Sequence, residues 1–306
     1  MKPTLGVIGL GIMGGAMAEA LRAEAYQVVG YDVRAQPRQR LKKAGGKPLR
    51  SSTAVAAAAD VLITSLATVA ALDDAAEQIA AAKRPRTRPA LVVIETSTLP
   101  IEDKQRALRR LQRAGITLLD CPISGTAVRM KQGAWTIFVS GAAAACKRVK
   151  PVLEVFTRNA PYVGAFGNGT RMKFIANHLV AIYNVAYGES LTFARKMGLD
   201  PQQVWELFAT SPVIGTGVFK LRGKFMVDRQ YLPATMKVEV WQKDMRVIGD
   251  MAKAVGCPTP LFAACAPIYS ATMAQGLSQH DTASVCEVLD AMAGGTTKKK
   301  RARLGK

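Results

Sequence analysis

Three glycines near the N-terminus have a spacing that could bring phosphate groups close to the backbone. They follow an apolar run at residues 4–9 and open a helical pattern. In a GxGxxG pattern the first glycine permits a tight turn, the second lets a pyrophosphate approach, and the third lets a helix pack closely on a strand. The phosphates would then meet the positive N-terminus of that helix. The residues expected to contact such a dinucleotide are Gly9, Gly11, Ile12, Met13 and Gly14.

An acidic residue closes the next apolar run. Asp32 follows residues 27–31. Its separation from the glycines along the sequence is close to that at which dinucleotide-binding folds have a carboxylate for the ribose hydroxyls. This position favours NAD over NADP. Arg34 could instead receive the 2′-phosphate of NADP, and Asp32 could simply cap the turn that follows.

A lysine and an asparagine are predicted to share one face of a long helix. Lys173 and Asn177 lie four residues apart in a proline-free stretch with helical apolar spacing, and side chains at i and i+4 are neighbours on a helix. An amide one turn from an ammonium could fix both the lysine and a substrate hydroxyl. Spacing alone does not distinguish this pair from a solvated helix face.

A Ser-Gly turn offers groups that could hold a carboxylate. Ser124 and Gly125 supply a hydroxyl and backbone N–H groups, and Thr126 adds a second hydroxyl. Taken alone, this segment could equally be an ordinary turn.

Together these motifs resemble the β-hydroxyacid dehydrogenase family, which includes 3-hydroxyisobutyrate dehydrogenase and tartronate semialdehyde reductase. The glycine stretch continues as Gly15-Ala16-Met17-Ala18, like the N-terminal signature of that family. Residues 120–126 resemble its substrate loop, residues 167–177 its Gly-x-Gly…Lys-x-x-Asn-Asn motif, and Lys243-Asp244 its Lys-Asp pair. The chain departs from the family at Thr126, which replaces a glycine, and at Ala176, which replaces the first asparagine.

The resemblance implies an NAD(P)-dependent oxidoreductase that transfers a hydride between the cofactor and a small β-hydroxyacid or semialdehyde. Lys173 would be the general acid and base, with Asn177 as its catalytic partner. Both would also bind the substrate, together with Ser124, Gly125 and Thr126. The resemblance adds cofactor contacts at Leu66, Ala67, Thr98 and Lys243, although the proline usual beside Leu66 is missing. Because adjacent helical residues do not face each other, Lys243 and Asp244 are expected to have separate roles.

The pattern of elements predicts an α/β fold followed by an all-α domain. Short apolar runs alternate with Ala-rich helical stretches in the first half, as in a doubly wound parallel (Rossmann) sheet. The strands expected there lie at residues 4–9, 27–31, 61–66 and 91–95, and those at 116–119, 135–140 and 162–163 would extend the sheet.

A long helix is expected at residues 170–197, capped by Asn168 or Thr170 and ended by Gly198. Beyond it helical patterns are broken by prolines and no strand is expected. We therefore predict a Rossmann domain at 1–164, an all-α domain like the C-terminal domain of phosphogluconate dehydrogenase at 165–293, and a basic disordered tail at 294–306.

The charge of the chain is strongly positive. It has 42 Lys and Arg residues against 22 Asp and Glu residues, a formal net charge of +20. Such an excess can attract nucleic acid or anionic metabolites and identifies neither. The basic clusters at 83–88 and 104–113 lack interleaved aromatic residues and are expected to be solvated, so nucleic acid is not an expected partner.

The remaining composition favours a cytoplasmic enzyme without a metal. The start of the chain lacks a secretory pattern, and no apolar run is long enough to span a membrane. The two histidines, His178 and His280, have no partner at metal-ligand spacing. The expected partners are a small anionic hydroxyacid or semialdehyde and further copies of the chain in a homodimer or homotetramer.

Two other hypotheses remain. The chain could be an imine reductase, since proteins of similar architecture reduce imines, although they do so with a different residue at the position of Lys173. It could also be a non-catalytic cofactor-binding protein that contacts nucleic acid through its basic tail.

Overall fold

The chain forms two compact units that divide between Phe174 and Ile175. The computed structural model describes residues 2–85, 87–130 and 133–294. Of the basic tail predicted at residues 294–306, residues 295–306 lie outside the described residues. The domain boundary predicted at 164 and 165 stays a prediction.

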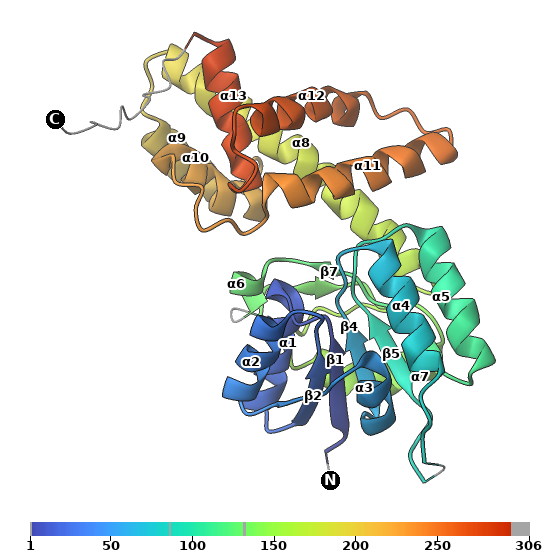
Figure 1. Cartoon of the computed structure of the whole chain (residues 1–306). Coiled ribbons are helices and arrows are strands. Elements are labelled where there is room, and N and C mark those ends of the chain that lie inside the picture. Colours follow the sequence, from blue (N-terminus) through green and yellow to red (C-terminus); the bar gives the residue numbers. More distant parts are fainter. Residues whose placement is uncertain (1, 86, 131–132, 295–306) are drawn as a thin grey trace, which may run out of the picture. The chain divides into compact units, whose positions relative to one another are not determined.

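The N-terminal unit is built on a six-stranded parallel sheet with the strand order β3-β2-β1-β4-β5-β6 (Figure 1). This is the doubly wound order, in which ligands bind at the carboxyl ends of the strands where the order reverses, here between β1 and β4. The strands are β1 Thr4–Ile8, β2 Gln27–Tyr31, β3 Lys47–Pro48, β4 Val61–Thr64, β5 Val92–Glu95 and β6 Thr117–Asp120. The Rossmann prediction is therefore confirmed.

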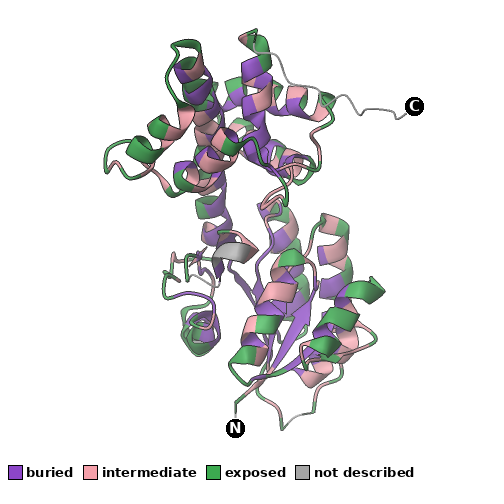
Figure 2. Cartoon of the chain, turned by 90° about the vertical axis from the view of Figure 1, so that its left-hand side faces the viewer, coloured by how far each residue is buried: buried purple, intermediate pink, exposed green. Residues whose placement is uncertain are grey.

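Helices cover both faces of the sheet. They are α1 Ile12–Ala23, α2 Ala35–Lys43, α3 Ser52–Ala58, α4 Val69–Ala80, α5 Ile101–Arg113, α6 Ala127–Met130 and α7 Ala143–Leu153. Successive residues of β1 supply opposite faces: Leu5 and Val7 join one apolar cluster, and Ile8 joins the other. This double coverage is why the strands are continuously apolar, and Figure 2 shows them buried.

Two segments expected to extend the main sheet form no strand of it, although Ser140 makes an isolated antiparallel bridge with Asp120 at the end of β6. Thr136–Ile137 forms β8, which pairs antiparallel with β7 (Ile123–Ser124) in a separate two-stranded sheet. Val139 and Tyr162 form an isolated bridge instead of a strand of the main sheet. Apolar patterning identified these segments as extended but carried no information on their partners. The strand β3 was missed because it is two residues long, Lys47 and Pro48, and has no apolar pattern.

The long helix α8 runs from Asn168 to Lys196. It ends as predicted, because Gly198 has φ +80° and its N–H donates to the carbonyl of Arg195. Its start differs from the prediction. Neither Asn168 nor Thr170 is a cap before the helix, since both lie within its first turn.

The C-terminal unit is built of helices joined by loops, and its described residues form no strand, as predicted. After α8 come α9 Pro201–Ala209, a π-helix at Phe219–Gly223, α10 Lys224–Asp228, α11 Val238–Ala254, α12 Pro260–Ala274, a 3₁₀ turn at Thr282–Ser284 and α13 Val285–Met292. None of the described helices combines the length and the apolar character that a membrane span requires.

Candidate active site

The carboxyl ends of β1, β4 and β5 bring three predicted cofactor-binding segments to one edge of the sheet. The N–H of Ser65, just after β4, donates to the carbonyl of Ile8, 2.9 Å away at the end of β1. The N–H of Leu66 donates to Oγ of Ser97 at 2.8 Å, which joins the loop after β4 to the loop after β5. Ala67 is exposed and Thr98 is partly exposed at this edge.

The glycines of the first turn differ in what surrounds them: two leave no room for a side chain, and one faces open space. Gly9 has φ +86°, and a Cβ there would lie 2.1 Å from the carbonyl oxygen of Ser65. A Cβ at Gly14 would lie 1.8 Å from the carbonyl oxygen of Gly9, so only glycine lets α1 pack this closely. A Cβ at Gly11 would come no closer than 3.7 Å to a described atom, Nη2 of Arg34.

The N-terminus of α1 has the properties of a phosphate site. Gly11 is its N-cap, no described side chain caps the helix, and its first turn contains no acidic residue. The first turn of α1 therefore contributes no negative charge of its own at the positive end of the helix. Ile12 is 71% exposed and Met13 is half-buried against the core. Open space at Gly11 and an uncapped helix end fit the pyrophosphate of a dinucleotide.

Asp32 connects the end of β2 to the glycine-rich turn. Its side chain is 7% exposed, and Oδ2 accepts the N–H of Leu10 at 2.9 Å. Its Oδ1 accepts the backbone N–H of Arg34 at 2.9 Å and Nε of the same residue at 3.3 Å. Asp32 thus caps the following turn and also lies beside the predicted phosphate site. The guanidinium of Arg34, 66% exposed, stays paired with it.

The Ser-Gly turn is held by a tryptophan that sequence reasoning did not select. Ser124 ends β7 and is half-buried, and Gly125 has φ +140°. A Cβ at Gly125 would lie 2.4 Å from Cδ1 of Trp135, and Nε1 of that indole donates to the carbonyl of Thr126 at 2.7 Å. Trp135 is 1% exposed. The sequence shows that Trp135 has an indole N–H donor, but only the fold brings that donor to the carbonyl of Thr126.

Lys173 lies in the first two turns of α8 and is 8% exposed. It belongs to a buried stripe with Thr170 and Asn177, at the i and i+3 or i+4 spacing that the sequence predicted. The alternative of a solvated lysine is therefore wrong.

The first turn of α8 is capped by side chains from a distant part of the sequence. Oδ2 of Asp120, the last residue of β6, accepts the N–H of Thr170 at 2.8 Å, and Oδ1 accepts its hydroxyl at 2.7 Å. Oγ of Ser140 accepts the N–H of Gly169 at 3.0 Å. A carboxylate at a helix N-terminus interacts favourably with the helix dipole. These bonds fix the first turn of α8 at the carboxyl end of β6.

A fully buried lysine lies beneath this turn, where a solvated helix face was expected. Nζ of Lys104 on α5 is 2.6 Å from Oε2 of Glu95, 2.8 Å from Oδ1 of Asp120 and 3.0 Å from Oγ1 of Thr170. Burial alone would lower the pKa of Lys104, but the carboxylates of Asp120 and Glu95 outweigh it and raise that pKa above its usual value. The ammonium is therefore charged throughout the physiological range.

The other basic cluster, residues 83–88, was also expected to be solvated, and this prediction is only partly correct. In residues 83–88, Arg84 donates to the carbonyl of Ala59 at 2.6 Å, and Arg88 pairs with Asp60 at 2.9 Å. These arginines bind main-chain and carboxylate oxygens at the amino end of β4.

In the C-terminal unit, an aspartate binds two predicted site residues. Oδ2 of Asp244 accepts Nδ2 of Asn177 at 2.9 Å, and its Oδ1 is 2.9 Å from Nζ of Lys243. Asp244 and Asn177 are 4% exposed. Asp244 was expected to support packing or a neighbouring charge, and it does pair with the ammonium of Lys243. Its bond to Asn177 was not expected from the sequence. The cofactor contact of Lys243 stays a prediction.

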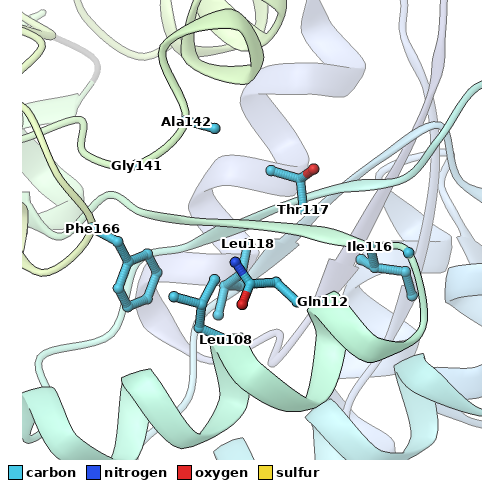
Figure 3. Close-up of a pocket in the computed structure, with 9 residues that line it drawn as sticks. Leu108, Gln112, Ile116, Thr117, Leu118, Gly141, Ala142 and Phe166 are labelled. Atoms are coloured by element: carbon cyan, nitrogen blue, oxygen red, sulfur yellow. The ribbon is translucent and has the colours of Figure 1, made fainter.

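A cavity of about 330 Å³ lies elsewhere in the N-terminal unit (Figure 3). Leu108 and Gln112 of α5, Leu118 of β6, Gly141 and Phe166 contribute to its lining. None of the predicted site residues lines it, so we do not assign the reaction to this cavity.

Comparison with known proteins covers both units. Residues 4–164 match the family model of the NAD binding domain of 6-phosphogluconate dehydrogenase. Residues 167–289 match the model described as the NAD-binding region of NADP-dependent 3-hydroxyisobutyrate dehydrogenase. The first match spans more than half of the chain.

Relatives match over nearly their full length. The chain is 29% identical over 294 residues to 2-hydroxy-3-oxopropionate reductase of Escherichia coli, covering 94% of this chain and 98% of that protein. It is 29% identical to L-threonate dehydrogenase of Cupriavidus necator, covering 94% and 96%. The solved structure of Mycobacterium tuberculosis 3-hydroxyisobutyrate dehydrogenase with L-serine aligns with a TM-score of 0.83 at 25% identity, covering 94% and 99%.

Proposed function

This chain belongs to the β-hydroxyacid dehydrogenase family, and we propose on that premise that it transfers a hydride between NAD(P) and a small β-hydroxyacid or semialdehyde. One observation carries the proposal. Lys173 is buried one turn from Thr170, which binds Asp120 at the carboxyl end of β6. The glycine-rich turn lies at the same edge of the sheet.

The side chains have distinct proposed roles. The cofactor, when bound, supplies or accepts the hydride. Lys173 accepts the proton of the substrate hydroxyl during oxidation and returns it during reduction. Asn177, oriented by Asp244, donates an amide hydrogen bond to the substrate oxygen. Ser124, Gly125 and Thr126 hold the substrate carboxylate with hydroxyl and backbone N–H groups.

The preferred cofactor in this proposal is NAD. A carboxylate at Asp32 can accept hydrogen bonds from the ribose hydroxyls and repels a 2′-phosphate. Arg34 is already paired with that carboxylate, so the charge it would offer NADP is partly neutralised. Lys243, Leu66, Ala67 and Thr98 complete the proposed cofactor contacts.

The relatives favour a hydroxyacid over an imine as substrate. The curated relatives reported above are named for 2-hydroxy-3-oxopropionate and L-threonate. The chain also retains the lysine that the imine hypothesis would replace. The substrate proposed is therefore a short acid with a hydroxyl or aldehyde group near the carboxylate.

The proposal is tested by a substrate panel with NAD and NADP. The panel contains 2-hydroxy-3-oxopropionate, L-threonate and 3-hydroxyisobutyrate, assayed with the native chain and Lys173→Ala. We expect Lys173→Ala to lower kcat by about 10² to 10⁴-fold, the contribution typical of a positioned acid or base. Lys196→Ala, an exposed position on the same helix, is the matched control and should keep native kcat. Equal turnover by native chain and Lys173→Ala would refute the assigned role.

A further inference from the structure

Lys104 connects three parts of the N-terminal unit that lie far apart in the sequence. It comes from α5, and its ammonium contacts Glu95 at the end of β5, Asp120 at the end of β6 and Thr170 on α8. Lys104, Glu95, Asp120 and Thr170 are all 0% exposed. A charged cluster so fully removed from water costs free energy to bury, and a pair of this kind is weak evidence for added stability. Its function therefore has to be sought in the geometry that it fixes.

The Glu95 arm of the cluster leads to the proposed cofactor segments. Oε1 of Glu95 accepts the backbone N–H of Ser97 at 2.9 Å. Oγ of Ser97 in turn accepts the N–H of Leu66 at 2.8 Å. Thr98 follows Ser97 directly in the chain. The carboxylate that neutralises Lys104 thus also orders the loops after β4 and β5.

The Asp120 arm leads to the proposed catalytic lysine. Both oxygens of Asp120 bind Thr170, one through its N–H and one through its hydroxyl. The same hydroxyl lies 3.0 Å from Nζ of Lys104. Thr170 precedes Lys173 by less than one helical turn, so its placement sets the position of Lys173.

The charges of the cluster explain why the ammonium is needed. Two buried carboxylates face one ammonium and the positive end of α8. Without Lys104 the two carboxylates would repel each other in a low-dielectric interior. Asp120 could relieve that repulsion only by moving away from Thr170 or by taking up a proton. Either change loosens the first turn of α8.

We propose that Lys104 is a positioning residue of the active site: through Asp120 and Thr170 it fixes the first turn of α8 and thereby the ammonium of Lys173. This inference rests on the proposed function for the role of Lys173. The claim that Lys104 fixes the first turn of α8 does not depend on a substrate.

The first test is Lys104→Met in the full chain. Hydrogen exchange of the amides at residues 168–174 reports the order of the turn without any substrate, and we expect it to be faster than in the native chain. With a substrate that the native chain turns over, we expect kcat to fall about 10- to 100-fold, as for a small displacement of a catalytic group. The KM for the cofactor should stay within about twofold, because the glycine-rich turn has its own contacts and the bonds from Ser97 to Glu95 and from Leu66 to Ser97 do not involve Lys104.

A charge rescue separates positioning from loss of packing. The double variant Glu95→Gln and Lys104→Met keeps one carboxylate, that of Asp120, which still has Thr170 and Ser140 as partners. We expect it to regain slow exchange at 168–174 and a large part of kcat. Failure of the rescue, with kcat, KM and exchange all equally impaired, would overturn the proposal and assign Lys104 to folding alone.

A milder variant keeps the test valid if Lys104→Met does not fold. Thr170→Val removes the hydroxyl that binds both Lys104 and Asp120 and leaves every charge in place. We expect the same direction of change in kcat and exchange. Thr192→Val is its match, since Thr192 on the same helix also donates to a buried carboxylate, that of Asp290, at 2.6 Å. It should leave kcat and the exchange at 168–174 unchanged.

The outcomes distinguish the two proposals. Native kcat and native exchange in both Lys104→Met and Thr170→Val would overturn the positioning role. Equal losses in Thr192→Val would do the same. If Lys173→Ala retains full turnover, the proposed function fails, and the exchange measurement still decides whether Lys104 orders the turn.

Discussion

For single residues, the proposed catalytic lysine and the lysine proposed to position it are both buried, Lys173 on α8 and Lys104 on α5. The spacing of Lys173 and Asn177 predicted a shared helix face, and both are buried on α8. Lys104 was missed although it occupies the buried stripe of α5 with Ile101, Ala107 and Leu111. A lysine on a helix normally marks an exposed position, so its place among buried residues was not expected. Its partners Glu95 and Asp120 become its neighbours only when the sheet forms.

At this scale Asp32 makes a prediction about cofactor choice. Asp32→Ser removes the charge that repels a 2′-phosphate and leaves Arg34 unpaired beside the site. We expect kcat/KM with NAD to fall about tenfold or more and the ratio of NADP to NAD use to rise, since each 1.4 kcal/mol of binding is about tenfold. Steady-state kinetics with both cofactors measures this, and Asp228→Asn is an exposed control. An unchanged cofactor ratio would remove Asp32 from the cofactor site.

At the scale of elements, most of the fold was predictable because the strands are continuously apolar and the glycines mark the turns. The carboxyl edge of the sheet therefore followed from residues such as Gly9 and Asp32. The partners of residues 135–140 did not follow, since strand pairing depends on long-range contacts that local pattern does not contain. The predicted start of α8 was wrong for the same reason. Its capping groups, Asp120 and Ser140, come from elsewhere in the chain.

The junction of β1 and α1 predicts the effect of a single methyl group. Gly14→Ala places a Cβ 1.8 Å from a backbone oxygen, which must shift the helix away from the strand. We expect a loss of about 1–3 kcal/mol in the free energy of unfolding, as for overpacking, and weaker NAD binding. Urea unfolding and cofactor fluorescence report the two effects.

A matched glycine in α11 provides the control. A Cβ at Gly249 would lie 3.9 Å from Phe262, an ordinary contact, so Gly249→Ala should stabilise the chain by about 0.5–1 kcal/mol. If Gly14→Ala and Gly249→Ala change the free energy of unfolding alike, close packing of α1 against β1 is not the reason for a glycine at position 14.

At the scale of the whole molecule, stability and assembly depend on features of the C-terminal unit that carry no motif. Arg222 pairs with the buried Asp281 at 3.1 Å, and Thr235 donates to the same carboxylate. Exposed apolar side chains also form two pairs along α8: Ile175 with Leu179, and Phe193 with Met197, which follows the last residue of the helix. All four are more than 40% exposed. Each pair has the i, i+4 spacing of neighbours on a helix.

Asp281 predicts how stability depends on pH. Burial would raise its pKa, but Arg222, Thr235 and two backbone N–H groups outweigh this and lower the pKa below its usual value. A depressed carboxylate pKa contributes stability that is present above about pH 4, the unfolded value, and is lost as pH falls through the folded value. Asp281→Asn should therefore cost about 3–5 kcal/mol at pH 7 and progressively less at acidic pH well below about 4, as the pH falls through the folded pKa.

Urea unfolding of Asp281→Asn and the native chain at both pH values measures this difference. Asp228→Asn breaks only an exposed pair with Lys224 and should change stability by less than about 1 kcal/mol. A penalty for Asp281→Asn that is the same at both pH values would contradict the assignment.

The exposed apolar pairs along α8 bear on the predicted homodimer or homotetramer. Exposed apolar side chains gathered on one face are typical of a surface that another chain covers. Light scattering of the native chain should therefore give the mass of two or four copies, and Phe193→Asp should give a smaller assembly. Lys253→Asp changes an exposed charge on α11 and should keep the native mass. A monomeric native chain would rule out self-association through this face.

The proposed reaction requires that Lys173 moves the substrate proton while the cofactor carries the hydride. Its most direct test is the single-turnover rate of nicotinamide absorbance change in Lys173→Ala, with and without an added small primary amine. We predict that the rate falls about 10² to 10⁴-fold and is partly restored by the amine, with cofactor affinity unchanged. Hydride transfer at the native rate in Lys173→Ala without any amine would contradict the claim.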